Sequence, residues 1–226
     1  MQHLPALLAV AGALAMPAGP AHSDTLPFVT FTSTGTITRG DDYIDYFHNG
    51  GVLIGQQFTM SLTVDVSTLS LFPSNPDAVV YGNATDTAVS WGELTINGRT
   101  FSWANDQSSS YVIKRNPADA GHGASIDTWG IANDGISVYA STDIRSLYNR
   151  FLPDRDITQP VVFDMGAPYM EGETYVSVNG GTQGFDFSAT RLASAAWTVS
   201  AVPEPGSYAM LAAGLAVAGL ARRRKR

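Results

Sequence analysis

The most constraining feature of the sequence is a strict alternation of apolar and polar residues between Phe58 and Val66. Successive side chains of a β-strand point to opposite faces of the sheet, so this alternation predicts an antiparallel strand with one buried face. Shorter segments of the same character recur along the chain, at Thr30–Thr38, Trp129–Ile131, Ile136–Val138, Val161–Met165, Tyr175–Val178, Phe185–Phe187 and Ala195–Ala201. With 44% hydrophobic residues the chain can bury a core, which excludes wholesale disorder.

Asn97-Gly98 marks the clearest hairpin, because this dipeptide supplies the positive φ angles of a type I′ turn. The turn places Ile96 opposite Arg99 and Leu94 opposite Phe101. Four apolar side chains then share one face, Leu94, Ile96, Phe101 and Trp103. A second hairpin is expected around Asn133-Asp134-Gly135.

One segment departs from the two-residue period. Its apolar residues fall at i, i+3, i+4 and i+7, namely Ile144, Leu147, Tyr148 and Phe151. Ser141 or Thr142 precedes them and Pro153 follows, which predicts a short amphipathic helix. No linker or repeat divides the chain between residues 24 and 201. We therefore expect this segment to fold alone as a single antiparallel β-sandwich, jelly-roll-like, with one short helix.

Composition excludes several classes of function. The chain has no cysteine, so it has no disulfide scaffold, no thiol nucleophile and no Cys-ligated metal centre. Residues 24–201 hold eight Lys and Arg against nineteen Asp and Glu, a net charge of −11. Such an acidic body is a poor partner for nucleic acid, whose affinity depends on neutralising phosphates.

The first 23 residues are typical of a secretory signal peptide. An apolar run from Leu4 to Leu14 is followed by small residues and prolines. We expect cleavage after Ser23, with cleavage after Ala21 as the alternative. This interpretation makes the Sec translocon and signal peptidase partners of the chain.

Residues 202–226 combine three elements with distinct physical roles. Pro203-Glu204-Pro205 forms an extended, accessible spacer, because its prolines cannot continue a helix or pair in a central strand. Ser207–Ala221 is an apolar stretch that as a helix spans roughly 22 Å, short for a bilayer. A basic tail follows and favours a cytoplasmic end, which makes the stretch a transmembrane helix; the tail consists of Arg222, Arg223, Arg224, Lys225 and Arg226.

This C-terminal arrangement resembles the PEP-CTERM sorting signal of exported proteins from exopolysaccharide-producing Gram-negative bacteria. The resemblance implies recognition by a membrane exosortase that cuts near Pro203-Glu204-Pro205. It implies passage through the inner membrane to the cell surface or extracellular matrix, and an association with exopolysaccharide or biofilm. A similar segment, the ice-binding protein C-terminal domain, ends some proteins labelled ice-binding. The stretch Thr34–Gly55 also resembles, loosely, the opening of many PEP-CTERM ectodomains.

The sequence carries no established catalytic motif. After signal cleavage only His48 and His122 remain, each in a glycine-containing loop, and their spacing does not require a metal. Aspartates gather in two loops, which raises calcium binding as an interpretation; they are Asp41, Asp42 and Asp45, and Asp154 and Asp156. Turn formation explains them as well, because Asp is a common turn residue. We therefore assign no catalytic, cofactor-binding or metal-ligating residue.

Other side chains suggest contacts with carbohydrate. Glu171 and Glu173, two residues apart, are expected on one strand face, and exposed Trp91, Trp129 and Tyr111 would stack on sugar rings. The threonines of Thr30–Thr38 resemble an ice-binding ladder, but only one such strand is visible. We predict a non-enzymatic, exported matrix or surface protein. The alternatives are a secreted carbohydrate-active hydrolase and a calcium-dependent glycan-binding module.

Overall fold

The computed structural model describes residues 28–72, 77–117, 121–132, 135–148, 150–179 and 184–200, without the side chains of residues 83–87 and 106–107. Apart from one 3₁₀ turn, η1 (Val66–Thr68), all regular elements in these ranges are strands. They are β1 (Phe28–Thr36), β2 (Arg39–Asp42), β3 (Gln57–Asp65), β4 (Ser70–Phe72), β5 (Ala78–Ile96), β6 (Arg99–Arg115), β7 (Gly123–Ile131), β8 (Ser137–Ser146), β9 (Val161–Phe163), β10 (Met170–Val178), β11 (Phe185–Ala189) and β12 (Leu192–Ser200). The prediction of an all-β body is confirmed.

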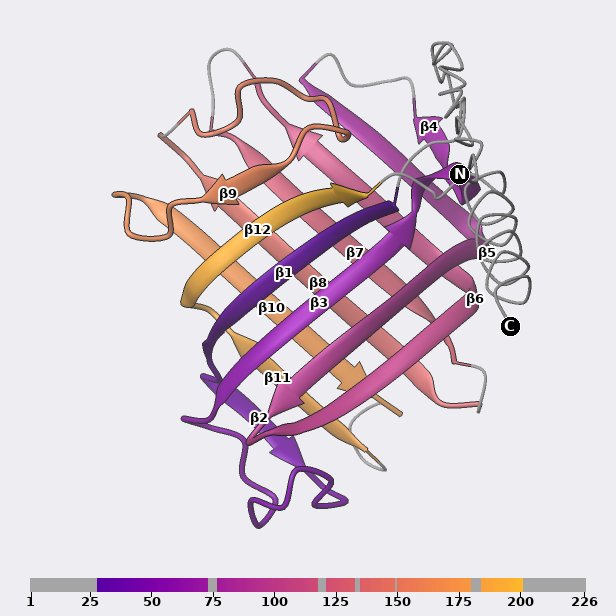
Figure 1. The fold of residues 1–226 in the computed structure, drawn as a ribbon, viewed down its shortest axis with the longest axis vertical. Coiled ribbons are helices and arrows are strands. Elements are labelled where there is room, and N and C mark those ends of the chain that lie inside the picture. Colours follow the sequence, from indigo (N-terminus) through magenta and orange to yellow (C-terminus); the bar gives the residue numbers. More distant parts are fainter. Residues whose placement is uncertain are drawn as a thin grey trace, which may run out of the picture.

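All twelve strands belong to one open antiparallel sheet, in the order β2-β11-β10-β8-β7-β6-β5-β3-β1-β12-β9, with β4 on β5. The sheet folds back on itself, so that β12, β1 and β3 lie across β7, β8 and β10 (Figure 1). We call these the β1 layer and the β8 layer. The structure thus has one continuous sheet where a sandwich of two separate sheets was predicted, because β5 and β6 run through both layers.

Irregular pairing allows β5 and β6 to change layers. Their register shifts between Asn83 and Ala88 and again before Ser90. A bulge bends a strand and reverses which of its residues face the core. In β6, Trp103 and Asn105 are buried before the bend, whereas Ser108 and Val112 are buried after it. The same strand therefore presents odd positions to the core in one layer and even positions in the other.

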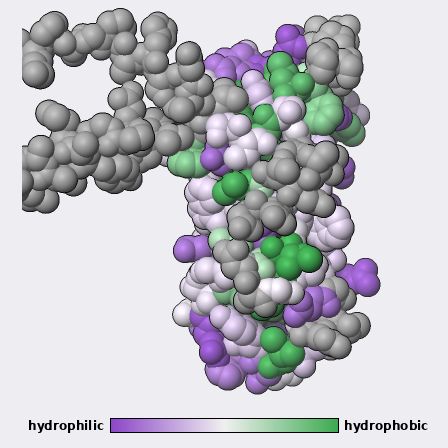
Figure 2. Space-filling view, turned by 90° about the vertical axis from the view of Figure 1, so that its right-hand side faces the viewer, coloured by the Kyte–Doolittle hydropathy of each residue, from purple (hydrophilic) through white to green (hydrophobic). Residues whose placement is uncertain are grey.

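The core lies between the two layers and is dominated by aliphatic and aromatic side chains. Phe58 of β3 packs against Phe187 of β11, with ring centroids 5.2 Å apart. A buried chain of hydroxyls also crosses the core, because Ser33 of β1 bonds Thr174 of β10 at 2.9 Å and Thr174 bonds Thr142 of β8 at 3.1 Å. These contacts hold the layers face to face. Figure 2, a view onto the right side of Figure 1, shows hydrophobic residues only in separate patches wherever the surface is coloured.

The Asn97-Gly98 hairpin is confirmed. Asn97 and Gly98 have φ angles of 52° and 74°, and Ile96 pairs with Arg99. The predicted shared face is present, since Leu94, Ile96 and Trp103 are buried and Phe101 packs against them. The pairing of Ile131 with Ser137 confirms the second hairpin, whose residues 133–134 lie outside the described part.

The predicted helix near Ile144 is wrong. Strand β8 continues to Ser146, between β7 and β10, and buries alternate residues. The helical spacing arose by coincidence: Ile144 belongs to the strand's period of two, while Leu147 and Tyr148 are exposed beyond its end. Pairing on both sides supplies the backbone of β8 with more hydrogen bonds than a single helical turn would offer.

A loop at residues 150–160 covers one end of the core. Lys114, a fully buried residue of β6, donates from Nζ to the carbonyls of Asp156 at 2.7 Å and Gln159 at 2.6 Å. Trp197 of β12 donates from its indole nitrogen to the carbonyl of Ile157 at 2.9 Å. Burial lowers the pKa of Lys114 to about 8, although Asp154 and Asp156 act against this shift. The sequence contained no sign that this lysine is internal.

The two ends of the described body lie side by side, because Phe28 at the start of β1 pairs with Ser200 at the end of β12. The signal peptide with its two cleavage sites and residues 202–226 with the Ser207–Ala221 segment lie outside the described residues. Within the described ranges, no helix is long and apolar enough to cross a membrane. The expected strand Ala195–Ala201 is confirmed up to Ser200, where β12 ends, and residue 201 lies outside the described residues.

Candidate functional site

An aromatic strip crosses the outer face of the β8 layer. It contains Phe72 of β4, Tyr111 of β6, Trp129 of β7, Tyr139 of β8 and Tyr175 of β10. Trp129 is 55% exposed and Phe72 43% exposed, whereas the three tyrosines are half-buried. With strands about 4.8 Å apart, the part from β6 to β10 spans roughly 14 Å across the sheet.

Strand register brings these side chains together. The odd positions of β7 and β8 face outward, and Trp129 pairs directly with Tyr139. The rings of Tyr139 and Tyr175 have centroids 5.5 Å apart, and those of Phe72 and Tyr111 are 6.3 Å apart. Each contact joins neighbouring or next-neighbouring strands, so the strip runs perpendicular to them.

Gly82 of β5 makes room for the Tyr111 ring. A Cβ atom at this position would lie 2.4 Å from Cδ1 of Tyr111 and 2.9 Å from Cε2 of Phe72. Such distances are shorter than van der Waals contact, so any side chain here would displace the two rings. The absent side chain lets Tyr111 lie flat over the neighbouring strand.

The middle of the strip holds an open hollow of about 680 Å³, lined by Ser109, Tyr111, Asp127, Thr128, Trp129 and Tyr139. Its carboxylate belongs to Asp127. Burial, with a smaller contribution from the charge of Asp143, raises the pKa of Asp127 to about 6. Burial and then the charge of Asp127 raise the pKa of Tyr139. The hollow thus combines flat apolar rings with one poorly solvated carboxylate.

A row of carboxylates continues beside the hollow. Asp143 of β8 pairs with Glu173 of β10, and burial raises the pKa of Asp143. Glu171 and Glu173 share one strand face, as predicted, and Glu171 accepts from Nε of Arg145 at 3.0 Å. Like charges on opposite residues destabilise a sheet. The repulsion between Asp143 and Glu173 is offset by Arg145 and Arg115, whose charges act to lower the pKa of Asp143.

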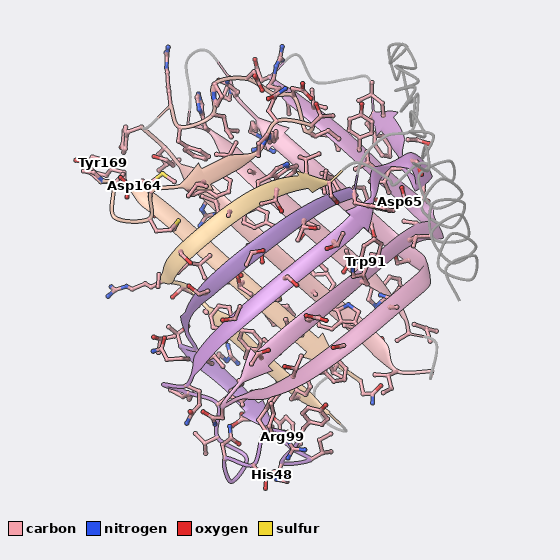
Figure 3. The ribbon with its side chains drawn as sticks, in the orientation of Figure 1. His48, Asp65, Trp91, Arg99, Asp164 and Tyr169 are labelled. Carbon is pink, nitrogen blue, oxygen red and sulfur yellow. The ribbon has the colours of Figure 1, made fainter. Side chains whose placement is uncertain are left out.

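The outer face of the β1 layer has a different chemistry. Trp91 of β5 lies here (Figure 3) and packs edge-on against Phe28 of β1. It is therefore on a different layer from Tyr111 and Trp129, with which it was grouped. Hydroxyl residues of five strands stand in one row across this face, Ser194, Thr34, Thr59, Thr95 and Thr100. The sequence showed only the threonines of β1.

The hydroxyls of the β1 layer bond to one another. Thr34 bonds Ser194 at 2.7 Å, Thr95 bonds Thr100 at 2.8 Å, and Thr30 bonds Thr63 at 2.8 Å. Cross-strand hydroxyl pairs of this kind stabilise a sheet. The arrangement accounts for the threonine ladder without an ice surface or any other ligand.

Among the described residues, neither histidine is hydrogen-bonded to a serine or an acidic side chain. The buried His122 accepts the backbone N–H of Leu152 at its Nδ1, at 2.9 Å, and its Nε2 has no partner among the described residues. Burial lowers the pKa of His122, so its neutral form holds the loop at residue 152. His48 lies at one end of the molecule beside the exposed carboxylate of Asp45, 3.7 Å away (Figure 3).

The loop aspartates bond to their own backbone. Asp42 accepts the N–H of Phe47 at 2.7 Å, and Asp45 accepts those of Asn49 and Gly50 at 3.0 and 2.9 Å. Asp154 and Asp156 likewise accept N–H groups two residues further on. Asp41 lies on β2, opposite Asp186 of β11. In the part of the chain that the structure describes, no three His, Asp or Glu side chains are grouped to hold a metal ion.

Sequence reasoning found two members of the strip, Tyr111 and Trp129, and missed the other three, Phe72, Tyr139 and Tyr175, as well as Asp127 of the hollow. Tyr139, Tyr175 and Asp127 each stand at an outward position of an alternating segment. That signal was present, but it did not tell which outward residues of different strands are neighbours. Only the register supplies that information.

A comparison with family models finds the PEP-CTERM protein-sorting motif at residues 201–226, beginning directly after β12. The chain carries a PEP-CTERM sorting motif. The motif implies recognition by an exosortase, and an exported protein that is anchored at the membrane before processing. No characterised protein and no solved structure matches the chain. The sorting motif therefore accounts for export and membrane anchoring. The function of the folded body can be inferred only from the surface of the body itself.

Proposed function

We propose that the chain is a non-enzymatic surface or matrix protein of a Gram-negative bacterium that binds exopolysaccharide through its aromatic strip. The observation that carries this proposal is the run of rings across β6, β7, β8 and β10 on an open sheet face. Sugar rings present flat C–H surfaces that pack on aromatic faces, and their hydroxyls bond nearby polar groups. The hollow offers both, since the Asp127 carboxylate lies among the rings.

The openness of the site suits a long polymer. A chain laid perpendicular to the strands would contact Trp129 and Tyr139 together, with both of its ends free to continue beyond the sheet. An enzyme that cleaves glycans requires two carboxylates at a fixed separation around one bond. The hollow between the rings contains one carboxylate, Asp127, which supports binding there, and Asp143, Glu171 and Glu173 line a separate hollow.

Retention of the full chain, purified in mild detergent, on native gels that contain isolated exopolysaccharide tests the proposal. Trp129→Ala should lower the affinity at least tenfold, because exposed aromatic anchors dominate such interfaces. Trp91→Ala is the matched control on the β1 layer and should bind as the unsubstituted chain does. No retention of the unsubstituted chain, or an equal loss of affinity in Trp129→Ala and Trp91→Ala, would overturn the proposal. The proposed contact requires no cofactor, so EDTA should leave retention unchanged.

A secreted hydrolase is the second candidate, and the raised pKa values of Asp127 and Asp143 favour it. The two residues lie diagonally across β7 and β8, because Asp127 pairs with Ser141 and Asp143 with Ser125. Release of reducing ends from the exopolysaccharide, lost in Asp127→Asn, would establish this function. Retention without such release would exclude it.

We further propose that exosortase cleaves near Pro203-Glu204-Pro205 and releases the body from its membrane anchor. Few residues along the chain separate Ser200, the end of β12, from Pro203-Glu204-Pro205. We therefore expect the folded body to lie close to the membrane before cleavage. A mature mass that begins near Asp24 and ends within a few residues of Glu204 would support this step. A mature mass that still includes Arg226, in a host with active exosortase, would contradict it.

A further inference from the structure

Asp127 is the carboxylate that lines the hollow between the aromatic rings. No hydrogen bond or ion pair reaches its side chain in the described ranges, although it lies half-buried in the hollow. Glu171 by contrast is paired with Arg145, and other aspartates accept backbone N–H groups in their own turns; these include Asp45, Asp65, Asp154, Asp156 and Asp164. A turn role therefore does not explain Asp127.

The surroundings of Asp127 are those of a receptor for a cation. Three rings line the same hollow, from Tyr111, Trp129 and Tyr139. The faces of such rings attract ammonium groups, most strongly where the group is partly desolvated. A carboxylate held among rings adds charge and a hydrogen-bond acceptor. The neighbouring Asp143 and Glu173 also carry negative charge on this face, which Arg145 and Arg115 partly offset.

We propose that the hollow at Asp127 binds the protonated amino group of a sugar, so that the strip prefers glycans with free amines. This inference rests on the proposed function and specifies its ligand. A neutral, acetylated sugar would still stack on Trp129 but would leave the Asp127 carboxylate without a counterion. A uronic acid polymer stacked on the rings would bring its carboxylates towards Asp127 and would be repelled there.

The test compares a glucosamine oligomer with its N-acetylated counterpart of equal length, at near-neutral pH, on the full chain in mild detergent. Isothermal titration calorimetry should show at least tenfold tighter binding of the glucosamine oligomer. Asp127→Asn should remove this preference and leave the affinity for the acetylated oligomer within about twofold. Trp129→Ala should weaken the binding of both oligomers.

A matched control separates this site from general attraction to an acidic protein. Glu93→Gln removes one exposed negative charge from the outer face of the β1 layer and should preserve the preference. Equal binding of both oligomers, with Trp129 still required, would overturn the amine site and leave the proposed function intact. A preference that survives Asp127→Asn would also overturn it. Binding of neither oligomer would contradict both proposals.

Discussion

The two outer faces of this folded sheet share the same backbone pairing and differ in how their side chains are satisfied. On the β1 layer, hydroxyls of neighbouring strands bond to one another, as Thr34 does with Ser194 and Thr95 with Thr100. On the β8 layer, aromatic rings surround Asp127, which has no bonding partner among the described residues. On the first face the hydroxyls are paired within the sheet, whereas on the second the Asp127 carboxylate lacks such a pair in the described ranges.

This difference shows why residue type alone is a poor guide to function on a sheet. Threonine and tyrosine are both common on exposed strands, because both pack well on a pleated surface. The register decides whether their polar groups meet partners of the same sheet. Unsatisfied, partly buried groups carry a cost that selection for stability would remove, which makes them candidates for binding.

The largest expected effect on binding comes from replacing aromatic side chains of the strip with threonine, the residue type that dominates the outer face of the β1 layer. The double substitution Trp129→Thr and Tyr139→Thr should weaken exopolysaccharide binding about 100-fold, equivalent to about 2.7 kcal/mol. Both side chains point outward, so the melting temperature should change little. Native gels with exopolysaccharide and circular dichroism melts measure the two quantities. Full binding by this variant would exclude the strip as the site.

Asp127→Asn should stabilise the protein at neutral pH by about 2 kcal/mol, because burial holds the pKa of Asp127 near 6, above the ordinary value of 3.8. A raised carboxyl pKa means that the charged form destabilises the fold. The gain should therefore be absent below about pH 4, grow as pH rises, and level off above about pH 6. The groups facing Asp127 are Tyr111 from β6, Tyr139 and Asp143 from β8, and none carries positive charge.

Urea denaturation of Asp127→Asn and of the unsubstituted chain between pH 4 and pH 8 measures this difference. Glu93→Gln serves as the control and should follow the unsubstituted chain at every pH, because Glu93 is exposed. A variant at position 127 that is less stable at neutral pH would show that the carboxylate has a stabilising partner.

Much of the fold could be predicted from the sequence, because local patterns determine much of it. Asn97-Gly98 and the alternation around it predicted both the turn and its register. The helix at Ile144 failed because four apolar positions fit two periods, and pairing with β7 and β10 selected the strand. The passage of β5 and β6 through both layers could not be predicted, since it depends on bulges that no residue type specifies.

The candidate site was predictable in part. Trp129 and Tyr111 were recognised as possible sugar contacts, and Trp91 was grouped with them although it lies on the other layer. Asp127 drew no attention, because a single aspartate in a strand is unremarkable until its neighbours are known. Long-range register, which brings Tyr111, Asp127 and Tyr139 together, is a property of the whole sheet.

Gly82→Ala should have a smaller effect, since its new methyl group would displace the ring of Tyr111 without touching Trp129. We expect a three- to tenfold loss of exopolysaccharide affinity and a change in unfolding free energy of about 1 kcal/mol or less. Gly92→Ala is the contrasting case, because its methyl group would meet the buried ring of Trp103 at 2.2 Å. That variant should lose stability instead. Unchanged binding in Gly82→Ala would remove Tyr111 from the site.

The smallest effect is expected on the hydroxyl face. Replacing both members of the Thr95–Thr100 pair with valine removes donor and acceptor together, which leaves no group unsatisfied. Stability should change by less than about 0.5 kcal/mol, and exopolysaccharide binding should be unaltered. A clear loss of binding would show that the β1 layer takes part in recognition.

Hydroxyl-radical footprinting of the full chain tests the central claim most directly, because each face carries its own tryptophan. The oxidation rates of individual aromatic side chains would be measured by mass spectrometry with and without exopolysaccharide. We predict that polymer protects Trp129 and Tyr139 and leaves Trp91 unchanged. Protection of Trp91 with Trp129 unaffected would contradict the assignment of the ligand to the aromatic strip.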